Sequence, residues 1–401
     1  MSSASVPTTK RKNKKPKIKM GDEVGDAGRK PRILEWEGST PLPPIPDTNY
    51  AAHVLKIIAK YGDAVGMVNA ETQEQRTFSE LCDLVPRVSA GLNAAGATLR
   101  HAVLYLAPNH VDFPLVVLSV LYRGAVFVPA SPSLSTDELV CVMKVSGVRW
   151  AVVDITVVAK LEAAISHLPS GTIRKMWVLG DVPGRSNLYD LVHFHPLPPI
   201  TKAEGLEPST AVAIMFMTSG TTGLPKAVML THRNLLVYLT RDRCALTFND
   251  TDNLRNMFRT TLLTVPLYYI YGYNFMMIPL SQGSTVVILS KFSPKMFLES
   301  IQKFKVLSLP VVPYLIQFLD ETPLLRQYDL TSLRVMFTAG SRLLPTHVTS
   351  LKQKLNVDIF NLYGMTESTC DGTRYLTTPN MKDGCVGKVM DVETGEMLGP
   401  G

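Results

Sequence analysis

Cysteine is scarce in this chain. Its five cysteines are scattered among 401 residues without a paired spacing, at Cys82, Cys141, Cys244, Cys370 and Cys385. A disulfide framework and a zinc site both need closely paired cysteines, so the pattern predicts reduced thiols, an intracellular compartment and no zinc site. The basic residues near the start are followed by no apolar stretch and form no amphipathic pattern. The sequence therefore predicts neither a secretory signal nor a mitochondrial presequence.

Most of the chain also lacks a net charge. The formal charge of +7 resides in residues 1–32, and the remaining residues hold 31 basic and 31 acidic side chains. The core therefore gives no electrostatic reason to expect nucleic acid as a partner. The segment TKRKNKKPKIK (Thr9–Lys19) is polar and Pro-interrupted, and it predicts disorder. A nuclear address, a contact with anionic surfaces and a solvated, solubilising arm all remain open for it. We expect a basic tail over 1–32, a Pro-rich segment over 33–48 and a core over 49–401.

No uninterrupted apolar run of membrane-spanning length is present. Residues 260–290 carry no charged side chain and are numerous enough to cross a bilayer. Helix-disfavouring or polar residues interrupt them, namely Pro266, Gly272, Asn274, Pro279 and Gly283. The pattern predicts a strand, a loop, a helix and a second strand inside a large core, and no transmembrane segment.

Short apolar strands alternate with helical patterns along the core. FSELCDLVPRVSAGLNAAG (Phe78–Gly96) predicts a helix with Ser79 as its N-cap and Gly96 as its end. Further strands are expected over 101–107, 125–130, 149–154 and 211–218, and a helix is expected to begin at Thr231 or His232. The alternation predicts an α/β fold with mainly parallel sheets flanked by helices. In such folds ligand sites gather at the C-terminal ends of the strands.

The stretch MTSGTTGLPKAV (Met217–Val228) follows one of these strands. Small and hydroxylated residues propagate neither helix nor strand, but they offer backbone N–H groups and hydroxyls without bulk. The lysine at the end indicates an anionic ligand such as a phosphate, whereas a flexible surface loop is the alternative. A Walker loop is excluded, because Leu-Pro precedes Lys226 and Ala227 follows it where a hydroxyl residue is required.

Three segments together resemble the adenylate-forming superfamily. They are TSGTTGLPKAV with the following MLTHRNL, the upstream LYRGAVFVPASPSLSTDEL and the downstream NLYGMTES. The superfamily includes acyl-CoA synthetases, 4-coumarate–CoA ligases, luciferases and peptide-synthetase adenylation domains, and the resemblance covers roughly Asn49 to the end. It implies a large N-terminal adenylate-forming domain that uses ATP to convert a carboxylate to acyl-AMP, with CoA as the subsequent thiol acceptor. A cytoplasmic or peroxisomal location fits this chemistry, and the basic tail leaves a nuclear one open.

The resemblance also implies roles for single residues. Thr218, Ser219, Gly220, Thr221, Thr222 and Gly223 would wrap the β- and γ-phosphates of ATP, and Lys226 would add a mobile positive charge. Thr366 would contact the phosphate of the adenylate, and Glu367 would hold Mg²⁺, which prefers carboxylate and phosphate oxygens. Lys226, Thr366 and Glu367 are thus the expected catalytic residues.

Adenine and substrate are assigned to neighbouring stretches. Tyr363, followed by Gly364, would stack near adenine, and the looser match FTAGSRLLP gives Gly340 and Ser341 as further nucleotide contacts. In VPLYYIYG, Tyr269 stands where the family often carries a histidine beside the carboxylate. We expect Tyr269 and Tyr271 to line a pocket for an apolar fatty or aryl acid, with a packed core aromatic as the alternative for Tyr269.

The last residues depart from the family pattern. VETGEMLGPG ends before the smaller C-terminal lid domain of the family, and GCVGKVMDVETG resembles a short internal deletion. A splice product, a partial gene model and a degenerate paralogue all remain open. Without the lid we expect impaired turnover. The alternative function is a non-catalytic nucleotide- or acyl-binding remnant, or an interaction protein.

Overall fold

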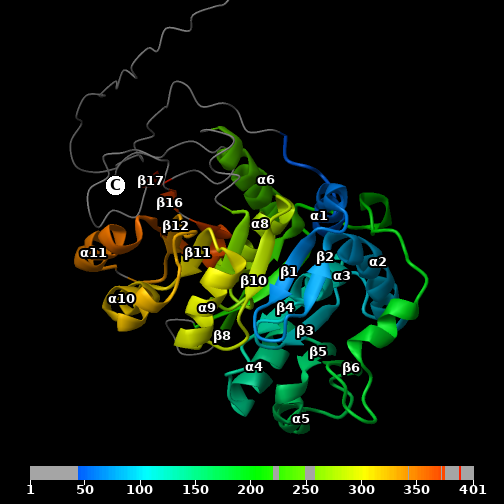
Figure 1. Cartoon of the computed structure of the whole chain (residues 1–401). Helices are drawn as coiled ribbons and strands as arrows, with labels where there is room; N and C mark the ends of the chain where they lie inside the picture. The colour runs from blue at the N-terminus through cyan, green and yellow to red at the C-terminus, as the bar shows by residue number, and fades with distance from the viewer. Residues whose placement is uncertain are drawn as a thin grey trace, which may run out of the picture.

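The computed structural model describes residues 44–219, 225–248, 258–341, 343–371, 373–374 and 388–389 (Figure 1). The predicted basic tail lies outside these ranges. Most of the described residues belong to two sheets and the helices that cover them. The predicted α/β class with mainly parallel sheets is therefore confirmed.

One sheet has seven strands in the order β13-β12-β11-β9-β10-β1-β2. Its neighbouring strands pair in parallel, apart from β2, which pairs antiparallel with β1 at one edge. The strands are β1 (Val65–Asn69), β2 (Gln75–Thr77), β9 (Thr260–Leu263), β10 (Thr285–Ile288), β11 (Ser308–Val311), β12 (Val335–Thr338) and β13 (Asp358–Asn361).

The other sheet has six strands in the order β6-β5-β3-β4-β7-β8. It is parallel as far as β7, and β8 pairs antiparallel with β7 at the edge. The strands are β3 (Ala102–Leu106), β4 (Val126–Ala130), β5 (Trp150–Asp154), β6 (Lys175–Leu179), β7 (Val212–Ser219) and β8 (Pro225–Thr231). Two short hairpins pair β14 (Gly364–Met365) with β15 (Cys370–Asp371) and β16 (Thr373–Arg374) with β17 (Lys388–Val389).

Successive side chains along a strand point to opposite faces of its sheet, and each face packs against its own layer of helices. In β3, Val103 and Tyr105 join the core that both sheets share, whereas Leu104 joins the core on the outer face. The shared core contains α1 (Tyr50–Ile58), α2 (Phe78–Ala94), α3 (Phe113–Tyr122), α6 (His232–Phe248) and α8 (Ile270–Ser281). The outer faces are covered by α4 (Thr136–Ser146) and α5 (Val158–Ser166) on one sheet, and by α9 (Pro294–Phe304), α10 (Pro313–Glu321) and α11 (Pro345–Leu355) on the other. Figure 1 shows these two outer groups at separate ends of the molecule.

The uncharged segment 260–290 has the predicted order of elements, namely β9, a loop, α8 and β10. Within the described ranges, no helix combines the length and the apolar character needed to cross a membrane. One predicted cap is wrong, because α2 begins after Thr77 rather than Ser79. The Thr77 hydroxyl accepts the Glu80 backbone N–H, and the Glu80 carboxylate accepts the Thr77 N–H, which completes a capping box.

Candidate functional site

The predicted phosphate-binding stretch is carried by a hairpin of β7 and β8. Thr218 on β7 pairs directly with Lys226 on β8. The Lys226 side chain is exposed, and no described residue forms a hydrogen bond or an ion pair with its amine. Ser219 ends β7 as a backbone position. The remaining predicted donors, Gly220, Thr221, Thr222 and Gly223, lie outside the described residues.

The predicted adenine contacts emerge together at one edge of the seven-stranded sheet. β12 and β13 are parallel and end in register, with Thr338 opposite Asn361. The segments that leave them therefore lie side by side, and they carry Gly340 and Tyr363 respectively. Gly340 has a φ of 95°, in the left-handed region that favours glycine. Tyr363 is 52% exposed at the strand ends.

A single 3₁₀ turn, η6 (Thr366–Ser368), follows the short strand β14, which comes after β13. The Glu367 side chain is exposed, and none of the described residues bonds to its carboxylate. η6 also lies against β8. The strand that carries Lys226 belongs to the six-stranded sheet, and it therefore lies against the turn that carries Thr366 and Glu367 and that follows the edge of the other sheet.

Tyr269 lies immediately before α8 and is 49% exposed, so it is not a packed core aromatic. The side chain of Ser131, the residue that follows β4, lies near the Tyr269 hydroxyl. Partial burial, with a smaller contribution from Tyr268, raises the pKa of the Tyr269 hydroxyl, and Ser131 partly offsets this shift. Tyr269 therefore stands between the end of the six-stranded sheet and α8. Ser131 was not singled out from the sequence, because a lone serine after a strand gives no distinguishing signal.

Tyr271 lies on the first turn of α8 and faces a group of aromatic rings. Its hydroxyl donates a hydrogen bond to the Phe337 carbonyl oxygen at 3.0 Å, at the end of β12. The Phe337 ring stacks on the rings of Phe258 and Phe360 at centroid distances of 5.4 and 5.5 Å. The centroid of the Phe275 ring lies 4.9 Å from that of Tyr271 and 5.1 Å from that of Phe337. An uncharged aromatic wall therefore forms part of the shared core beside β12, the strand that precedes Gly340.

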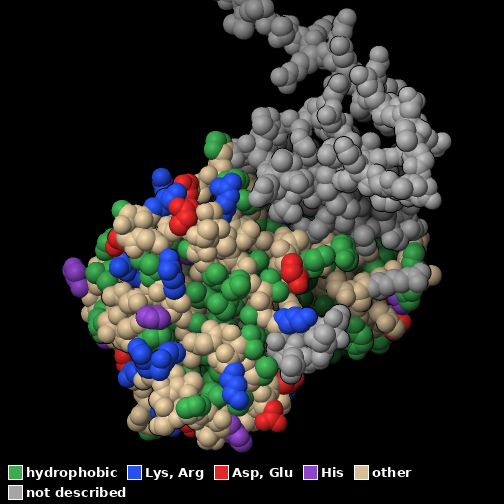
Figure 2. Space-filling view, turned by 180° about the vertical axis from the view of Figure 1, so that it is seen from behind, with side chains coloured by type: hydrophobic (Ala, Val, Ile, Leu, Met, Phe, Trp, Pro, Cys, Tyr) green, Lys and Arg blue, Asp and Glu red, His purple; other side chains and the backbone are tan. Residues whose placement is uncertain are grey.

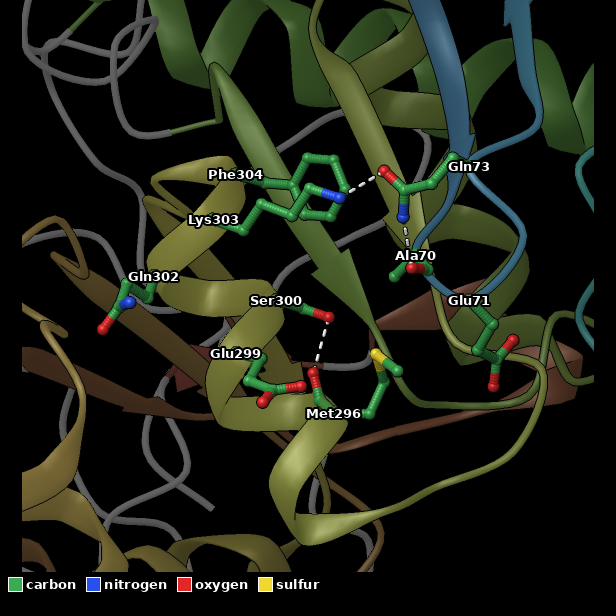
Figure 3. A pocket seen from close by; sticks show the side chains of 9 residues that line it. All are labelled: Ala70, Glu71, Gln73, Met296, Glu299, Ser300, Gln302, Lys303 and Phe304. Carbon is green, nitrogen blue, oxygen red and sulfur yellow. Dashed lines mark hydrogen bonds between the residues drawn. The ribbon is translucent and has the colours of Figure 1, made fainter.

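A separate hollow of about 490 Å³ lies between the turn after β1 and helix α9 (Figure 3). Its polar groups bond to one another. The Lys303 amine donates to the Gln73 side-chain oxygen, and the Gln73 amide donates to the Ala70 carbonyl. Ser300 donates to the Met296 carbonyl of its own helix. None of these groups is left pointing at an absent ligand, so we assign no function to this hollow.

Charged side chains form no single-sign region on the face shown in Figure 2, where Lys and Arg are scattered among Asp and Glu. This distribution agrees with the neutral composition of the core.

Comparison with known proteins identifies relatives over most of the chain. The family model described as AMP-binding enzyme matches residues 55–401. The chain is 29% identical to the peroxisomal OPC-8:0-CoA ligase 1 of Arabidopsis thaliana, over 90% of this chain and 66% of that protein. It is 28% identical to a 4-coumarate–CoA ligase of Pinus taeda, over 88% of this chain and 68% of the relative. The chain thus spans about two thirds of the length of these curated relatives.

Solved structures share the fold. A long-chain-fatty-acid–CoA ligase from Archaeoglobus fulgidus has a TM-score of 0.76 at 22% identity, covering 92% of this chain and 76% of that one. The N-terminal domain of FACL13 from Mycobacterium tuberculosis has a TM-score of 0.69 at 21% identity, covering 80% and 77%. The extent of the family match, together with the motifs it includes, settles the assignment: this chain belongs to the AMP-binding enzyme family, and it is similar to the N-terminal part of acid–CoA ligases.

Proposed function

We propose that this chain binds ATP and activates an apolar carboxylic acid as its acyl adenylate, with CoA as the subsequent acceptor. The observation that carries the proposal is the contact between β8, which bears Lys226, and η6, which bears Thr366 and Glu367. Activation requires two anions to approach each other, because a carboxylate oxygen attacks the α-phosphate of ATP and pyrophosphate leaves. Positive charge and hydrogen-bond donors fixed at that point lower the barrier. We propose residues 49–401 as the unit that forms this site.

Each residue of the site has a task in the proposed reaction. The β7–β8 hairpin, with Thr218 and the donors that follow it, would hold the β- and γ-phosphates, and Lys226 would offset their charge. The Thr366 hydroxyl would orient the α-phosphate. The Gly340–Ser341 turn and the Tyr363 ring would hold the adenine, since an aromatic ring stacks on a planar base.

Magnesium fits the residues of this turn. Mg²⁺ in nucleotide sites is held by one or two carboxylates, with phosphates and waters as the other ligands. The Glu367 carboxylate is exposed and has no partner among the described residues, so its oxygens are available. When bound, the ion would supply charge neutralisation of the phosphates. We therefore propose Glu367 as the protein ligand.

Replacing Glu367 with glutamine is expected to reduce the Mg²⁺-dependent gain in ATP affinity by about tenfold, because the amide removes the anionic ligand without changing the shape. AMP binding without Mg²⁺ should change far less. Calorimetry of ATP with and without Mg²⁺ measures both effects. The matched control is Glu321→Gln, an exposed glutamate at the end of α10. Unchanged Mg²⁺ dependence in Glu367→Gln would show that the metal ligand is elsewhere.

The substrate is expected to be apolar. The wall formed by Phe258, Tyr271, Phe275 and Phe337 contains no charged side chain, and burial against aromatic rings favours a fatty or an aryl acid over a small polar one. In a competition assay, octanoate or cinnamate should bind at least about tenfold more tightly than acetate. Preference for acetate over both acids would overturn the assignment of the pocket.

The location in the cell stays a proposal. The Arabidopsis thaliana relative is named as peroxisomal, and a peroxisomal or cytoplasmic location of this chain agrees with the proposed chemistry.

A further inference from the structure

The segment that follows η6 has an unusual backbone. Thr369 has a φ of 64° and Cys370 a φ of 128°, so two consecutive non-glycine residues lie in the region that favours glycine. Both side chains are buried, at 3% and 5% exposure. Such a conformation persists where surrounding contacts hold it, and it is found most often at binding and catalytic sites.

Asn274 holds this backbone from a separate element. It is 3% exposed on α8, and its side-chain amide Nδ2 donates a hydrogen bond of 2.7 Å to the Thr369 carbonyl oxygen. The Thr369 backbone N–H in turn donates to the Thr366 carbonyl at 3.0 Å, which closes η6. Asn274 thus bonds to the residue that immediately follows the turn bearing Thr366 and Glu367. Asn274 is also a polar residue within the otherwise largely apolar run IYGYNFMMI.

We propose that Asn274 is a positioning residue for this site. Its hydrogen bond holds the Thr369 carbonyl, which keeps Thr369 in the left-handed conformation and thereby sets the direction of η6 against β8. Without that bond, Thr369 would relax toward negative φ, since a β-branched residue disfavours the left-handed region. The turn would then lose its fixed relation to the strand that carries Lys226. The inference rests on the proposed function for the roles of Thr366 and Glu367, but the backbone effect does not depend on it.

The first test is binding of Mg²⁺·ATP to the full chain by calorimetry. Asn274→Leu should weaken binding by about tenfold, because a buried carbonyl loses its donor and the turn relaxes. Thr369→Gly removes the cost of positive φ, so Asn274→Leu made in that background should weaken binding by about threefold at most. Equal losses in the two backgrounds would refute the proposed link between Asn274 and the backbone of Thr369. Asn274→Asp, which keeps the shape and removes the amide donor, repeats the test if the leucine variant does not fold.

The control is Asn49→Leu. Asn49 is buried to the same degree, and its amide donates to the Leu121 and Tyr122 carbonyls at 2.9 and 3.2 Å, away from η6. It should lower the melting temperature and leave Mg²⁺·ATP affinity unchanged. An equal loss of affinity in Asn49→Leu would mean that the effect of Asn274 is general destabilisation.

The second test separates this inference from the proposed function. Hydrogen exchange of the backbone amides over 364–371 should become faster in Asn274→Leu than in Asn49→Leu, whether or not nucleotide binds. If the unmodified chain binds no ATP but this difference appears, the proposed function fails and the positioning role of Asn274 stands. If ATP binds and exchange over this segment is the same in both variants, the inference about Asn274 is wrong.

Discussion

Replacing Lys226 with alanine is expected to weaken ATP binding by about 10- to 100-fold, which is the range for losing a charge-assisted contact. The Lys226 amine is exposed on β8 and has no partner among the described residues, so its charge is available to a ligand. In the proposed site it faces the β- and γ-phosphates, which AMP lacks. AMP affinity should therefore change by less than about threefold.

Calorimetric titration of the same preparation with ATP and then with AMP measures this difference. Lys175→Ala is the matched control, because Lys175 is an exposed lysine at the start of the edge strand β6. It should leave both affinities unchanged. Equal losses for ATP and AMP in a Lys226→Ala variant that keeps the melting temperature of the unmodified protein would place the lysine near the α-phosphate and contradict a β,γ-phosphate role.

Strong local patterns are the signals that a sequence shows most directly. In the helix α4, Ser135 forms a capping box with Glu138, and Gly147 ends the helix with a φ of 64°. Its signals lie within one segment and need no distant partner. The start of α6 after Thr231 was predicted for the same reason. Gly340 and Tyr363 follow the ends of β12 and β13, and the alternation of elements indicates that ligand sites gather at such strand ends.

Features that depend on distant partners could not be predicted. The strand β8 was not recognised, because its pairing with β7 is decided by a partner across a loop rather than by its own seven residues. The bond from Asn274 to Thr369 joins residues 95 positions apart, and the periodicity of α8 gives no sign of it. The Thr77 cap was missed although its signal was local. Thr77 and Ser79 are both possible N-caps of α2. Glu80 favours Thr77, because a capping box joins residues three positions apart.

Acid is expected to destabilise this protein through His232, by about 3 kcal/mol between pH 7 and pH 4. His232 is the first residue of α6 and is fully buried. Its Nδ1 accepts the backbone N–H of Tyr50 at 3.1 Å, so the folded state requires that nitrogen to be unprotonated. Burial lowers the pKa of the imidazole to about 4, from an ordinary value of 6.5.

The direction of the effect follows from these two values. Above pH 6.5 the imidazole is neutral in both the folded and the unfolded chain, and the full stability is present. As the pH falls below 6.5 the unfolded chain takes up a proton that the folded chain does not, so the free energy of unfolding decreases until the pH reaches about 4. Below that value both states are protonated and this contribution changes no further. Protonation of Nδ1 would also break its hydrogen bond with the Tyr50 N–H, which joins α1 to the start of α6. That start directly follows β8, the strand that bears Lys226.

Urea unfolding between pH 7.5 and pH 4.5 tests this expectation against a variant that cannot titrate. In His232→Asn the side-chain oxygen can accept the Tyr50 N–H, and the smaller side chain leaves a cavity, so the variant should be less stable at pH 7.5. Its free energy of unfolding should nevertheless fall less steeply with acid than that of the unmodified protein. The two slopes should differ by about 1.4 kcal/mol per pH unit below pH 6. His195→Asn, which removes an exposed histidine, should keep the slope of the unmodified protein. Parallel slopes for the unmodified protein and His232→Asn would mean that the buried imidazole is not the group that makes this fold sensitive to acid.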